Sequence, residues 1–379
     1  MEKIKILHVL TDTNIGGAGT LLINYLHCFD REKYDIAVCL PQGAALTPMV
    51  EAEGYRVIPL QHGHDKSFEM SALSEFIRLF RAEKPDIVHT HSAFSAKLAA
   101  YLAGVKSRIY TRHCAFDMPK KLTTFPGKQI NGLVNNTLAT QIIAVAQAAK
   151  ENLLETGVSE KKITVILNGV LPIKETSEEQ RQLFRQKLGI APQTFVAGIP
   201  ARLEHYKGHA YLVEAVREVV QQEPDVVFLF MGRGSEEQRL KQQAAELGVS
   251  DKIIFTGFIR DLTPYYNIMD LNLNCSYGTE ATSLSLAEGV SLSIPAVATT
   301  FGGNPYMITP MKNGLLVPPK DAHAMAQAIL QLVGDRELLK TLGAGARRVY
   351  EETFTAQAMT AQLEKIYDAE AARIGKGKR

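Results

Sequence analysis

The chain repeats one pattern in both of its halves: short apolar runs bounded by turn residues alternate with segments of helical periodicity. Short continuous apolar runs between turns are typical of strands that are buried on both faces. In the first half the runs are Ile4–Leu10, Ile36–Leu40, Arg56–Leu60, Ile87–Thr90, Arg108–Thr111 and Ile142–Val145. In the second half they are Phe195–Pro200, Val226–Met231, Lys252–Thr256, Leu271–Asn274 and Ala296–Thr299. Strands alternating with crossover helices form parallel sheets, so the sequence predicts an α/β protein with doubly wound, Rossmann-like domains.

The length of 379 residues indicates two such domains, because a single core rarely holds so many. We predict an N-terminal domain over residues 1–175 and a C-terminal domain over residues 176–353. A polar stretch without strand character places the linker around residues 170–185. The amphipathic segment 354–379 is predicted to be a C-terminal helix that crosses back to the N-terminal domain.

Composition narrows the functional classes. A net charge of +2 gives no nucleic-acid footprint, and no apolar run approaches the roughly 20 residues of a membrane span. Four scattered cysteines argue against a disulfide framework and against a structural zinc site, and favour a reducing compartment. The N-terminus lacks the apolar region of a signal peptide, so we expect a cytoplasmic protein.

Two carboxylates, Glu280 and Glu288, flank a small, hydroxyl-rich turn that is predicted to start a helix. Thr282 and Ser283 are suited to cap that helix, and backbone N–H groups at its start would face an anion. Such a site fits a ligand with phosphates in the middle and hydroxyl-bearing rings at both ends. A sugar nucleotide has that shape.

Further candidate residues follow other predicted strands, where ligands bind in open parallel sheets. Arg202 and Lys207 come after the run Phe195–Pro200 and are suited to hold phosphate oxygens. The remaining candidates are glycines that permit close approach to a ligand and residues beside which a planar base would stack. They are Gly16, Gly17, Gly232, Phe258 and Ile259.

The histidines indicate a functional role less strongly than the residues described above. His113 ends a predicted strand, where it could donate to or accept from a substrate hydroxyl. His89 and His91 have the alternate spacing of metal ligands, but nothing nearby in the sequence completes a ligand set. We therefore expect no metal site and no cofactor apart from the substrate nucleotide.

In their order along the chain, these features resemble the family 4 glycosyltransferases, which are retaining enzymes of the GT-B fold with two domains facing across a cleft. The resemblance is carried by Gly16-Gly17, Asp86–His91, Thr111–His113, Val145–Glu151, Val165–Val170, Arg202 to Gly208, Gly232–Gly234, Glu280 with Glu288, Val297–Gly303 and Asn313–Val317. It implies that the N-terminal domain binds the acceptor and that the C-terminal domain binds the nucleotide sugar.

The same resemblance implies roles for the matching residues. Arg202 and Lys207 would hold the donor diphosphate with help from Gly17, and Glu288 would bind the ribose diol. The N–H groups of Thr282, Ser283 and Leu284 would also contact the diphosphate. Glu280 and His113 would contact the transferred sugar. The implied reaction moves sugar from a nucleotide diphosphate, UDP by expectation, to a lipid-linked or polysaccharide acceptor of the cell envelope, without a metal.

Two alternative functions remain open, and the chain also departs from the family pattern. Ala281 stands where the family usually has Gly, and Tyr306 stands where it commonly has Glu, which puts the identity of the sugar in doubt. A nonhydrolysing sugar-nucleotide epimerase would share the scaffold and need no acceptor. A non-catalytic sugar-nucleotide-binding protein would bind the donor without turnover.

A basic segment suggests where the acceptor comes from. Residues 106–128 contain six Lys or Arg and a single acid, mixed with apolar residues. Patches of this kind attract anionic lipid surfaces. Peripheral contact with the inner face of the cytoplasmic membrane is therefore a hypothesis, and a solvated or acceptor-facing loop is the alternative.

Overall fold

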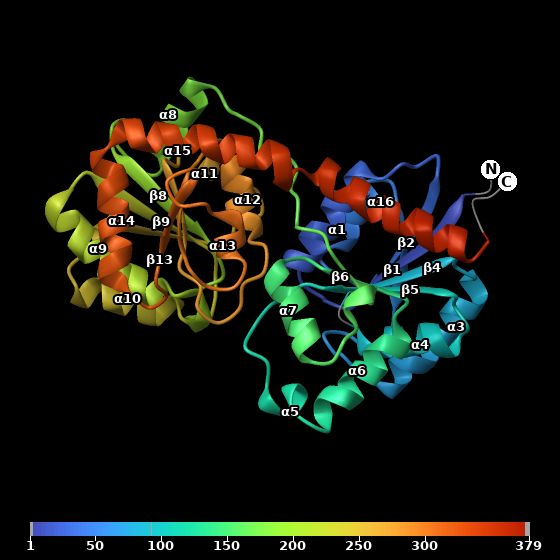
Figure 1. Cartoon of the computed structure of the whole chain (residues 1–379). Helices are drawn as coiled ribbons and strands as arrows, with labels where there is room; N and C mark the ends of the chain where they lie inside the picture. The colour runs from blue at the N-terminus through green and yellow to red at the C-terminus, as the bar shows by residue number, and fades with distance from the viewer. Residues whose placement is uncertain (1–2, 92, 376–379) are drawn as a thin grey trace. The chain divides into compact units, whose positions relative to one another are not determined.

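A computed structural model describes residues 3–91 and 93–375 of the protein. The chain divides into two compact units (Figure 1), and each is described here by itself. Unit 1 comprises Met1–Gly169 together with Ala356–Arg379, and unit 2 comprises Val170–Thr355. The chain passes from unit 1 to unit 2 after Gly169, a little before the expected boundary at residue 175. The C-terminal helix belongs to unit 1. Residues 376–379 of the predicted C-terminal segment lie outside the described residues.

Unit 1 is built on a seven-stranded parallel sheet of order β3-β2-β1-β4-β5-β6-β7. Its strands are β1 Ile4–Leu10, β2 Tyr34–Pro41, β3 Arg56–Leu60, β4 Ile87–His91, β5 Ser107–Arg112, β6 Gln141–Ala144 and β7 Ile163–Val165. The register pairs His8 with His89, and His91 with Thr111. Because side chains alternate along a strand, these four residues share one face of the sheet.

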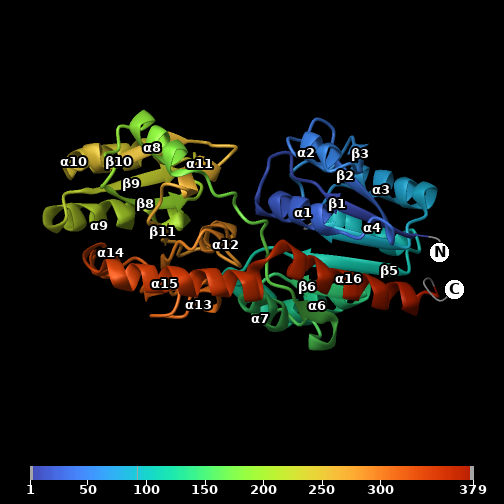
Figure 2. The ribbon, with the colours of Figure 1, turned by 90° about the horizontal axis from the view of Figure 1, so that it is seen from above.

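The helices of unit 1 cover both faces of that sheet. They are α1 Gly17–Cys28, α2 Thr47–Ala52, α3 Met70–Glu83, α4 Phe94–Leu102, α5 Lys120–Thr123, α6 Gly127–Leu138, α7 Gln147–Glu155 and α16 Ala356–Arg373, with a 3-10 turn at Glu160–Lys162. One face packs against α3 and α4 through an apolar cluster that includes Leu7, Val9 and Phe76. The other face is covered by α1 and α16, which run side by side (Figures 1 and 2).

Helix α16 is attached to unit 1 by polar contacts as well as by packing. The Tyr34 hydroxyl donates to Asp368 over 2.7 Å, and Glu370 accepts from the hydroxyls of Ser107 and Thr140, each over 2.7 Å. Leu363 and Tyr367 of this helix are fully buried. The last helix is therefore an integral layer of unit 1.

Unit 2 has a six-stranded parallel sheet of order β10-β9-β8-β11-β12-β13. Its strands are β8 Phe195–Pro200, β9 Val226–Met231, β10 Ile253–Gly257, β11 Leu271–Asn274, β12 Ala296–Thr299 and β13 Gly314–Val317. The helices are α8 Glu178–Lys187, α9 His209–Gln222, α10 Glu237–Glu246, α11 Thr263–Tyr266, α12 Leu284–Ser291, α13 Asn304–Met307, α14 Ala322–Gly334 and α15 Arg336–Val349. Short turns lie at His205–Lys207 and Ser250–Lys252, and a π-helical turn lies at Tyr350–Phe354. Helices α9 and α14 pack side by side on one face of the sheet (Figure 2).

The prediction of a linker around residues 170–185 is wrong in its second half, because helix α8 begins at Glu178. Ser177 caps this helix: its hydroxyl accepts from the Gln180 N–H while the Gln180 side chain accepts from the Ser177 N–H. That reciprocal pair is a strong helix start signal within a stretch that looks merely polar. Strands β7 and β13 were also not predicted.

Within the described residues, none of the helices combines the length and apolar character that a membrane span requires.

Candidate active site

The loop between β8 and α9 holds the predicted cations of unit 2. Gly208 ends its 3-10 turn with φ of 76°, and a Cβ at this position would lie 2.0 Å from the Cys275 carbonyl oxygen. Only glycine fits such a close approach in this conformation. Gly208 therefore lets the loop pass directly over the end of β11, where it brings Lys207 near Glu280.

Lys207 and Glu280 form an ion pair, with the Lys207 Nζ 2.9 Å from the Glu280 Oε2. The two side chains are 17% and 10% exposed, so the pair is largely withdrawn from water. A buried ion pair stabilises a fold only when further hydrogen bonds satisfy its charged groups. Asn274 and Ser276 supply them, donating to the same Oε2 over 3.1 and 2.9 Å.

A buried polar network extends from this pair. The Asn304 amide donates to Asn274 Oδ1 and to the Thr299 hydroxyl oxygen, each over 3.3 Å. The Thr299 hydroxyl in turn donates to the Ser276 carbonyl over 2.6 Å. These residues were not among the predicted site residues. Their common signal is a polar side chain at or just beyond the carboxyl end of an apolar strand.

Arg202, the other predicted cation, leaves the end of β8 and is exposed. Its Nη2 donates to the Tyr206 hydroxyl over 2.9 Å. Lys207 is thus held by a carboxylate, whereas Arg202 retains most of its donors for a ligand.

The start of α12 partly matches its prediction. Ser283 is the N-cap, and its hydroxyl accepts from the Leu286 N–H over 3.4 Å and from Asn274 over 3.2 Å. The Ser283 N–H, however, donates to the Met307 sulfur over 3.2 Å. The expectation that this amide faces an anion is therefore wrong in this structure. Thr282, buried beside it, and Leu284, the first helical residue, complete the predicted set.

Glu288 lies on α12 with its carboxylate beside Tyr266. The Tyr266 hydroxyl donates to Glu288 Oε2 over 2.8 Å and to the Ser285 carbonyl over 2.9 Å. Burial raises the pKa of Glu288 to about 7, which the hydrogen bond from Tyr266 opposes. Glu288 is therefore poised to change charge near neutral pH.

The predicted base-binding residues meet at the ends of β9 and β10. An isolated β-bridge joins Gly232 to Gly257, which places Gly232 beside the loop that carries Phe258. A Cβ on Gly232 would lie 2.2 Å from the Ala201 carbonyl oxygen, so this glycine also allows the β8 and β9 loops to touch. Phe258 is 63% exposed, whereas Ile259 packs into the apolar cluster around Tyr266. Of this pair, only Phe258 presents a ring for stacking.

The remaining candidates, Gly16, Gly17 and His113, belong to unit 1. Gly16 is the N-cap of α1 and Gly17 is its first residue; both are exposed. His113 follows β5, is partly exposed, and has its Nε2 2.8 Å from the Nδ1 of His91. Burial lowers the pKa of His113 to about 4. His91 and His89 lie next to His8, a residue that the sequence analysis did not connect with them.

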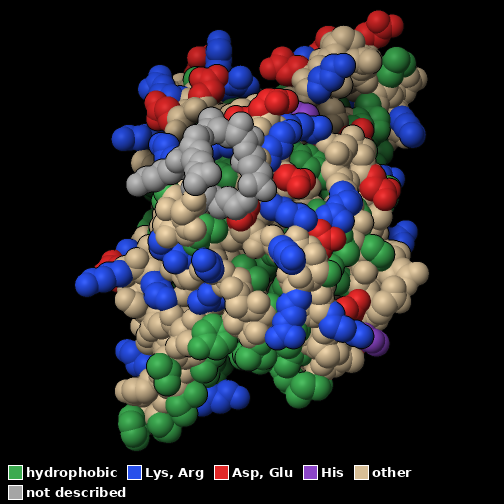
Figure 3. All heavy atoms as spheres, turned by 90° about the vertical axis from the view of Figure 1, so that its right-hand side faces the viewer, with side chains coloured by type: hydrophobic (Ala, Val, Ile, Leu, Met, Phe, Trp, Pro, Cys, Tyr) green, Lys and Arg blue, Asp and Glu red, His purple; other side chains and the backbone are tan. Residues whose placement is uncertain are grey.

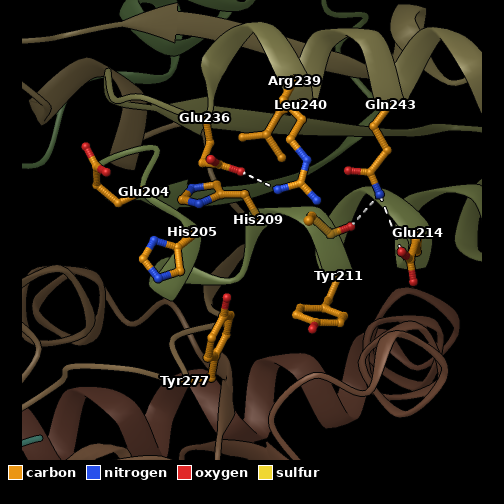
Figure 4. A pocket seen from close by; sticks show the side chains of 11 residues that line it. Glu204, His205, His209, Tyr211, Glu214, Glu236, Arg239, Leu240, Gln243 and Tyr277 are labelled. Carbon is orange, nitrogen blue, oxygen red and sulfur yellow. Dashed lines mark hydrogen bonds and ion pairs between the residues drawn. The ribbon is translucent and has the colours of Figure 1, made fainter.

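A pocket beside the β8–α9 loop does not suit the predicted diphosphate (Figure 4). Its polar lining includes the carboxylates Glu204, Glu214 and Glu236 together with Arg239. Arg239 is paired with Glu236 over 2.8 Å. The lining therefore keeps an excess of negative charge, and an anion would be disfavoured there.

Two family models match the chain. Residues 15–172 match the model described as Glycosyltransferase Family 4, and residues 180–349 match the model described as Glycosyl transferases group 1. The two matches fall almost entirely within unit 1 and unit 2 respectively.

Individual relatives match over nearly their whole length. A UDP-Gal:alpha-D-GlcNAc-diphosphoundecaprenol alpha-1,3-galactosyltransferase from Escherichia coli is 25% identical over 348 residues, covering 89% of this chain and 90% of its own. A glycosyltransferase structure from Rickettsia africae is 24% identical, with a TM-score of 0.83 and coverage of 98% and 99%. The structure of Anabaena Alr3699/HepE in complex with UDP and glucose is 21% identical, with a TM-score of 0.83 and coverage of 96% and 99%.

Proposed function

The chain belongs to the family 4 glycosyltransferases of the GT-B fold, and we propose that it moves a sugar from a UDP-linked donor to a lipid-linked or polysaccharide acceptor of the cell envelope, with retention of configuration. The observation that carries this proposal is the ion pair between Lys207 and Glu280. It joins a cation that is suited to a phosphate to a carboxylate that can accept from sugar hydroxyls, on the carboxyl edge of one sheet.

The diphosphate end of the donor fits the cations of the β8–α9 loop. As the bond from the sugar to the phosphate breaks, negative charge grows on the departing diphosphate. Arg202 and Lys207 would stabilise that charge, and a preorganised group of this kind is worth about 10² to 10³ in rate. Arg202 would supply positive charge that is unpaired among the described residues, and Lys207, although paired with Glu280, would donate a remaining N–H to the diphosphate, which supports transfer without a metal.

The sugar end would be recognised by Glu280. Its Oε2 is occupied by Lys207, Asn274 and Ser276, which fixes the carboxylate in one orientation. Its Oε1 accepts from none of the described residues and is left for hydroxyls of the sugar. At the nucleoside end, Glu288 would accept from the ribose diol, and Phe258 would stack on the base beside Gly232.

The relatives support both substrates at the level of class. The name of the Escherichia coli relative gives a UDP-linked sugar as donor and a diphosphoundecaprenol-linked sugar as acceptor. The Anabaena structure holds UDP and glucose. A UDP donor and a lipid-linked acceptor are therefore the first substrates to test.

A lipid-linked acceptor requires contact with a membrane, and α5 and α6 offer a surface for it. Phe125, Ile130 and Leu133 are 81%, 60% and 70% exposed on and just before α6. The exposed Lys120 and Lys121 lie on the neighbouring α5. Figure 1 places both helices at the lower end of unit 1, and Figure 3 shows hydrophobic side chains gathered with Lys and Arg at that end. We propose that this surface, the α5–α6 patch, rests on the anionic inner leaflet of the membrane.

The test begins with a thermal-shift screen of nucleotide sugars, because a ligand that binds the folded state raises its stability. The donor found in this way is then assayed for transfer to an undecaprenyl-diphosphate-linked sugar. Lys207→Ala and Arg202→Ala should each abolish most transfer, whereas Lys187→Ala, which removes an exposed cation of α8, should leave it unchanged. Near-normal turnover in both site variants would contradict the proposed site. Donor conversion that needs no acceptor would instead indicate an epimerase, and tight binding without turnover would indicate a binding protein.

A further inference from the structure

A line of hydrogen bonds crosses the face of the unit 1 sheet that α1 and α16 cover. We name it the histidine network. It joins three strands, the last helix and the residue after β5. Its members, in order, are Thr111, His89, Tyr367, His8, His91 and His113.

The inner half of the network lies deep in unit 1. The Thr111 Oγ1 is 2.6 Å from His89 Nε2, and the His89 Nδ1 is 2.6 Å from the Tyr367 hydroxyl. The same hydroxyl is 3.1 Å from His8 Nε2. Thr111, His89, Tyr367 and His8 are all fully buried. Each member of this half therefore depends on the others for its hydrogen bonds.

The outer half leads toward the surface. The His8 Nδ1 is 3.0 Å from His91 Nε2, and the His91 Nδ1 is 2.8 Å from His113 Nε2. His91 is 1% exposed, whereas His113 is partly exposed. Every ring nitrogen of His8, His89 and His91 thus has a partner within the network.

The rings are neutral at physiological pH. Burial lowers the pKa of His8 to about 3 and of His113 to about 4, and it lowers those of His89 and His91 well below the ordinary value. A neutral imidazole carries one N–H and one acceptor nitrogen. Each interior ring must therefore donate on one side and accept on the other, so all the links run in a common direction.

Thr111 decides that direction. Within the described residues, His89 is the only hydrogen-bond partner of its buried hydroxyl. If His89 donated to Thr111, the hydroxyl proton would have no acceptor, and an unsatisfied buried donor costs about 1–3 kcal/mol. If Thr111 donates, every group in the network is satisfied. The Tyr367 hydroxyl then donates to His8, His8 donates to His91, and His91 donates to His113.

We propose that the histidine network holds His113 in the Nδ1–H tautomer, so that its outer nitrogen is an obligate donor toward a ligand oxygen. Thr111, His89, Tyr367, His8 and His91 are positioning residues that act through His113. The Nδ1 of His113 has no hydrogen-bond partner among the described residues, so it is available for a ligand. That the ligand oxygen belongs to the donor sugar rests on the proposed function; the tautomer itself does not.

A metal ion would be the other use of this cluster, since ligand nitrogens of His8, His89 and His91 lie within 4.8 Å of one another. A metal would require nitrogens that carry no proton and have no competing partner. All six ring nitrogens of these three residues are already engaged in the network. The geometry therefore favours the hydrogen-bonded arrangement.

The tautomers can be read from long-range ¹H–¹⁵N correlation spectra of the full-length protein, labelled with ¹⁵N-histidine and free of ligand. The proposal expects His8, His89, His91 and His113 to carry their proton on Nδ1, all in one polarity. Signals with the proton on Nε2 of His113 or His91 would overturn it. Binding of one equivalent of added Zn²⁺, with loss of the N–H signals of His8 and His91, would also overturn it.

Two matched variants on β4 separate the network from a general effect on folding. His91→Phe removes the direct donor to His113, so the His113 ring should populate both tautomers. His89→Phe removes an equally buried imidazole from the same strand, but it leaves the Tyr367 hydroxyl to donate to His8, so His113 should keep its proton on Nδ1. A mixture of tautomers in both variants, or in neither, would contradict the proposed direction. The measurement needs no substrate, so its outcome is independent of the proposed function.

Discussion

Lys207 and Glu280 lie 73 residues apart in sequence and are joined by a 2.9 Å ion pair between Nζ and Oε2. The contact depends on Gly208, whose missing side chain lets the β8–α9 loop lie against the Cys275 carbonyl. The pair therefore links two segments that the sequence presents as separate motifs. It also orients each partner before a ligand arrives.

This pair should show energetic coupling in the unliganded protein. Glu280→Gln leaves the Lys207 ammonium in a poorly hydrated place without its ionised partner, so unfolding free energy should fall by about 1–3 kcal/mol. In a Lys207→Met background the same change should cost less, and the coupling should amount to about 0.5–3 kcal/mol. Denaturant unfolding of the four proteins measures it. Additive effects would mean that the ion pair does not hold the site together.

Glu288 should make nucleotide binding depend on pH. Burial raises its pKa to about 7, so the folded protein holds the carboxyl protonated below that pH and ionised above it. Ribose hydroxyls donate best to the ionised form, so UDP affinity should rise by up to about tenfold as pH rises through neutrality. Isothermal titration with UDP at several pH values checks this. Glu288→Gln, which cannot ionise, should lose this rise and keep only the pH dependence that comes from the UDP terminal phosphate, whose second pKa is about 6.

The raised pKa of Glu288 also makes the stability of the unliganded protein depend on pH. The folded pKa lies above the ordinary value of 4.5, so unfolding releases a proton between those values and stability falls as pH rises from 4.5 to about 7. A shift of this size corresponds to a loss of about 3 kcal/mol, complete above the folded pKa. Comparison of wild type with Glu288→Gln isolates this part of the profile. Equal slopes for both proteins would show that Glu288 is not the group responsible.

Six predicted strands match the structure to the residue, and they include the four-residue strands β11 and β12 as well as longer apolar ones. Ile4–Leu10, Phe195–Pro200 and Val226–Met231 match β1, β8 and β9 to the residue. β7 has only three residues, and β13 begins at a glycine, which is disfavoured in strands, so neither segment gives a clear strand pattern. Tertiary pairing at a sheet edge defines such strands, and no local pattern reports it.

The residues of the candidate site also differ in how clearly the sequence indicates them. Arg202, Lys207 and Glu280 were identifiable as candidates because each follows a strand and carries a charge that suits a phosphate or a sugar. Asn274 and Ser276 were not, because a single amide or hydroxyl is common and gains meaning only through the group it contacts. The histidine network could not be predicted from the sequence, because Tyr367 lies 278 residues from His89. Only the packing of α16 on the sheet brings them together.

If the tautomer of His113 matters for transfer, the two histidine variants should differ in turnover. His91→Phe should lower kcat by at least about tenfold, because His113 would donate to the ligand in only part of the molecules. His89→Phe should lower kcat much less at a similar cost in stability, since both changes replace a buried imidazole in β4. Steady-state kinetics with the donor found in the screen, together with melting temperatures, separates the two effects. Equal losses of kcat would show that the cluster acts only through folding.

The α5–α6 patch should bind membranes through both charge and apolar contact. Each nearby cation contributes roughly 1 kcal/mol on an anionic surface, so co-sedimentation should be strong with phosphatidylglycerol vesicles, weak with phosphatidylcholine, and reduced by salt. Replacing Phe125, Ile130 and Leu133 together by Ser should lower vesicle binding by at least about tenfold, because burying an apolar side chain is worth about 1.5–3 kcal/mol. Leu183→Ser is the matched control, since Leu183 is 59% exposed on α8 of unit 2. Binding that ignores vesicle charge, or that falls equally in the control, would remove the α5–α6 patch as the membrane contact and leave the acceptor to be reached in another way.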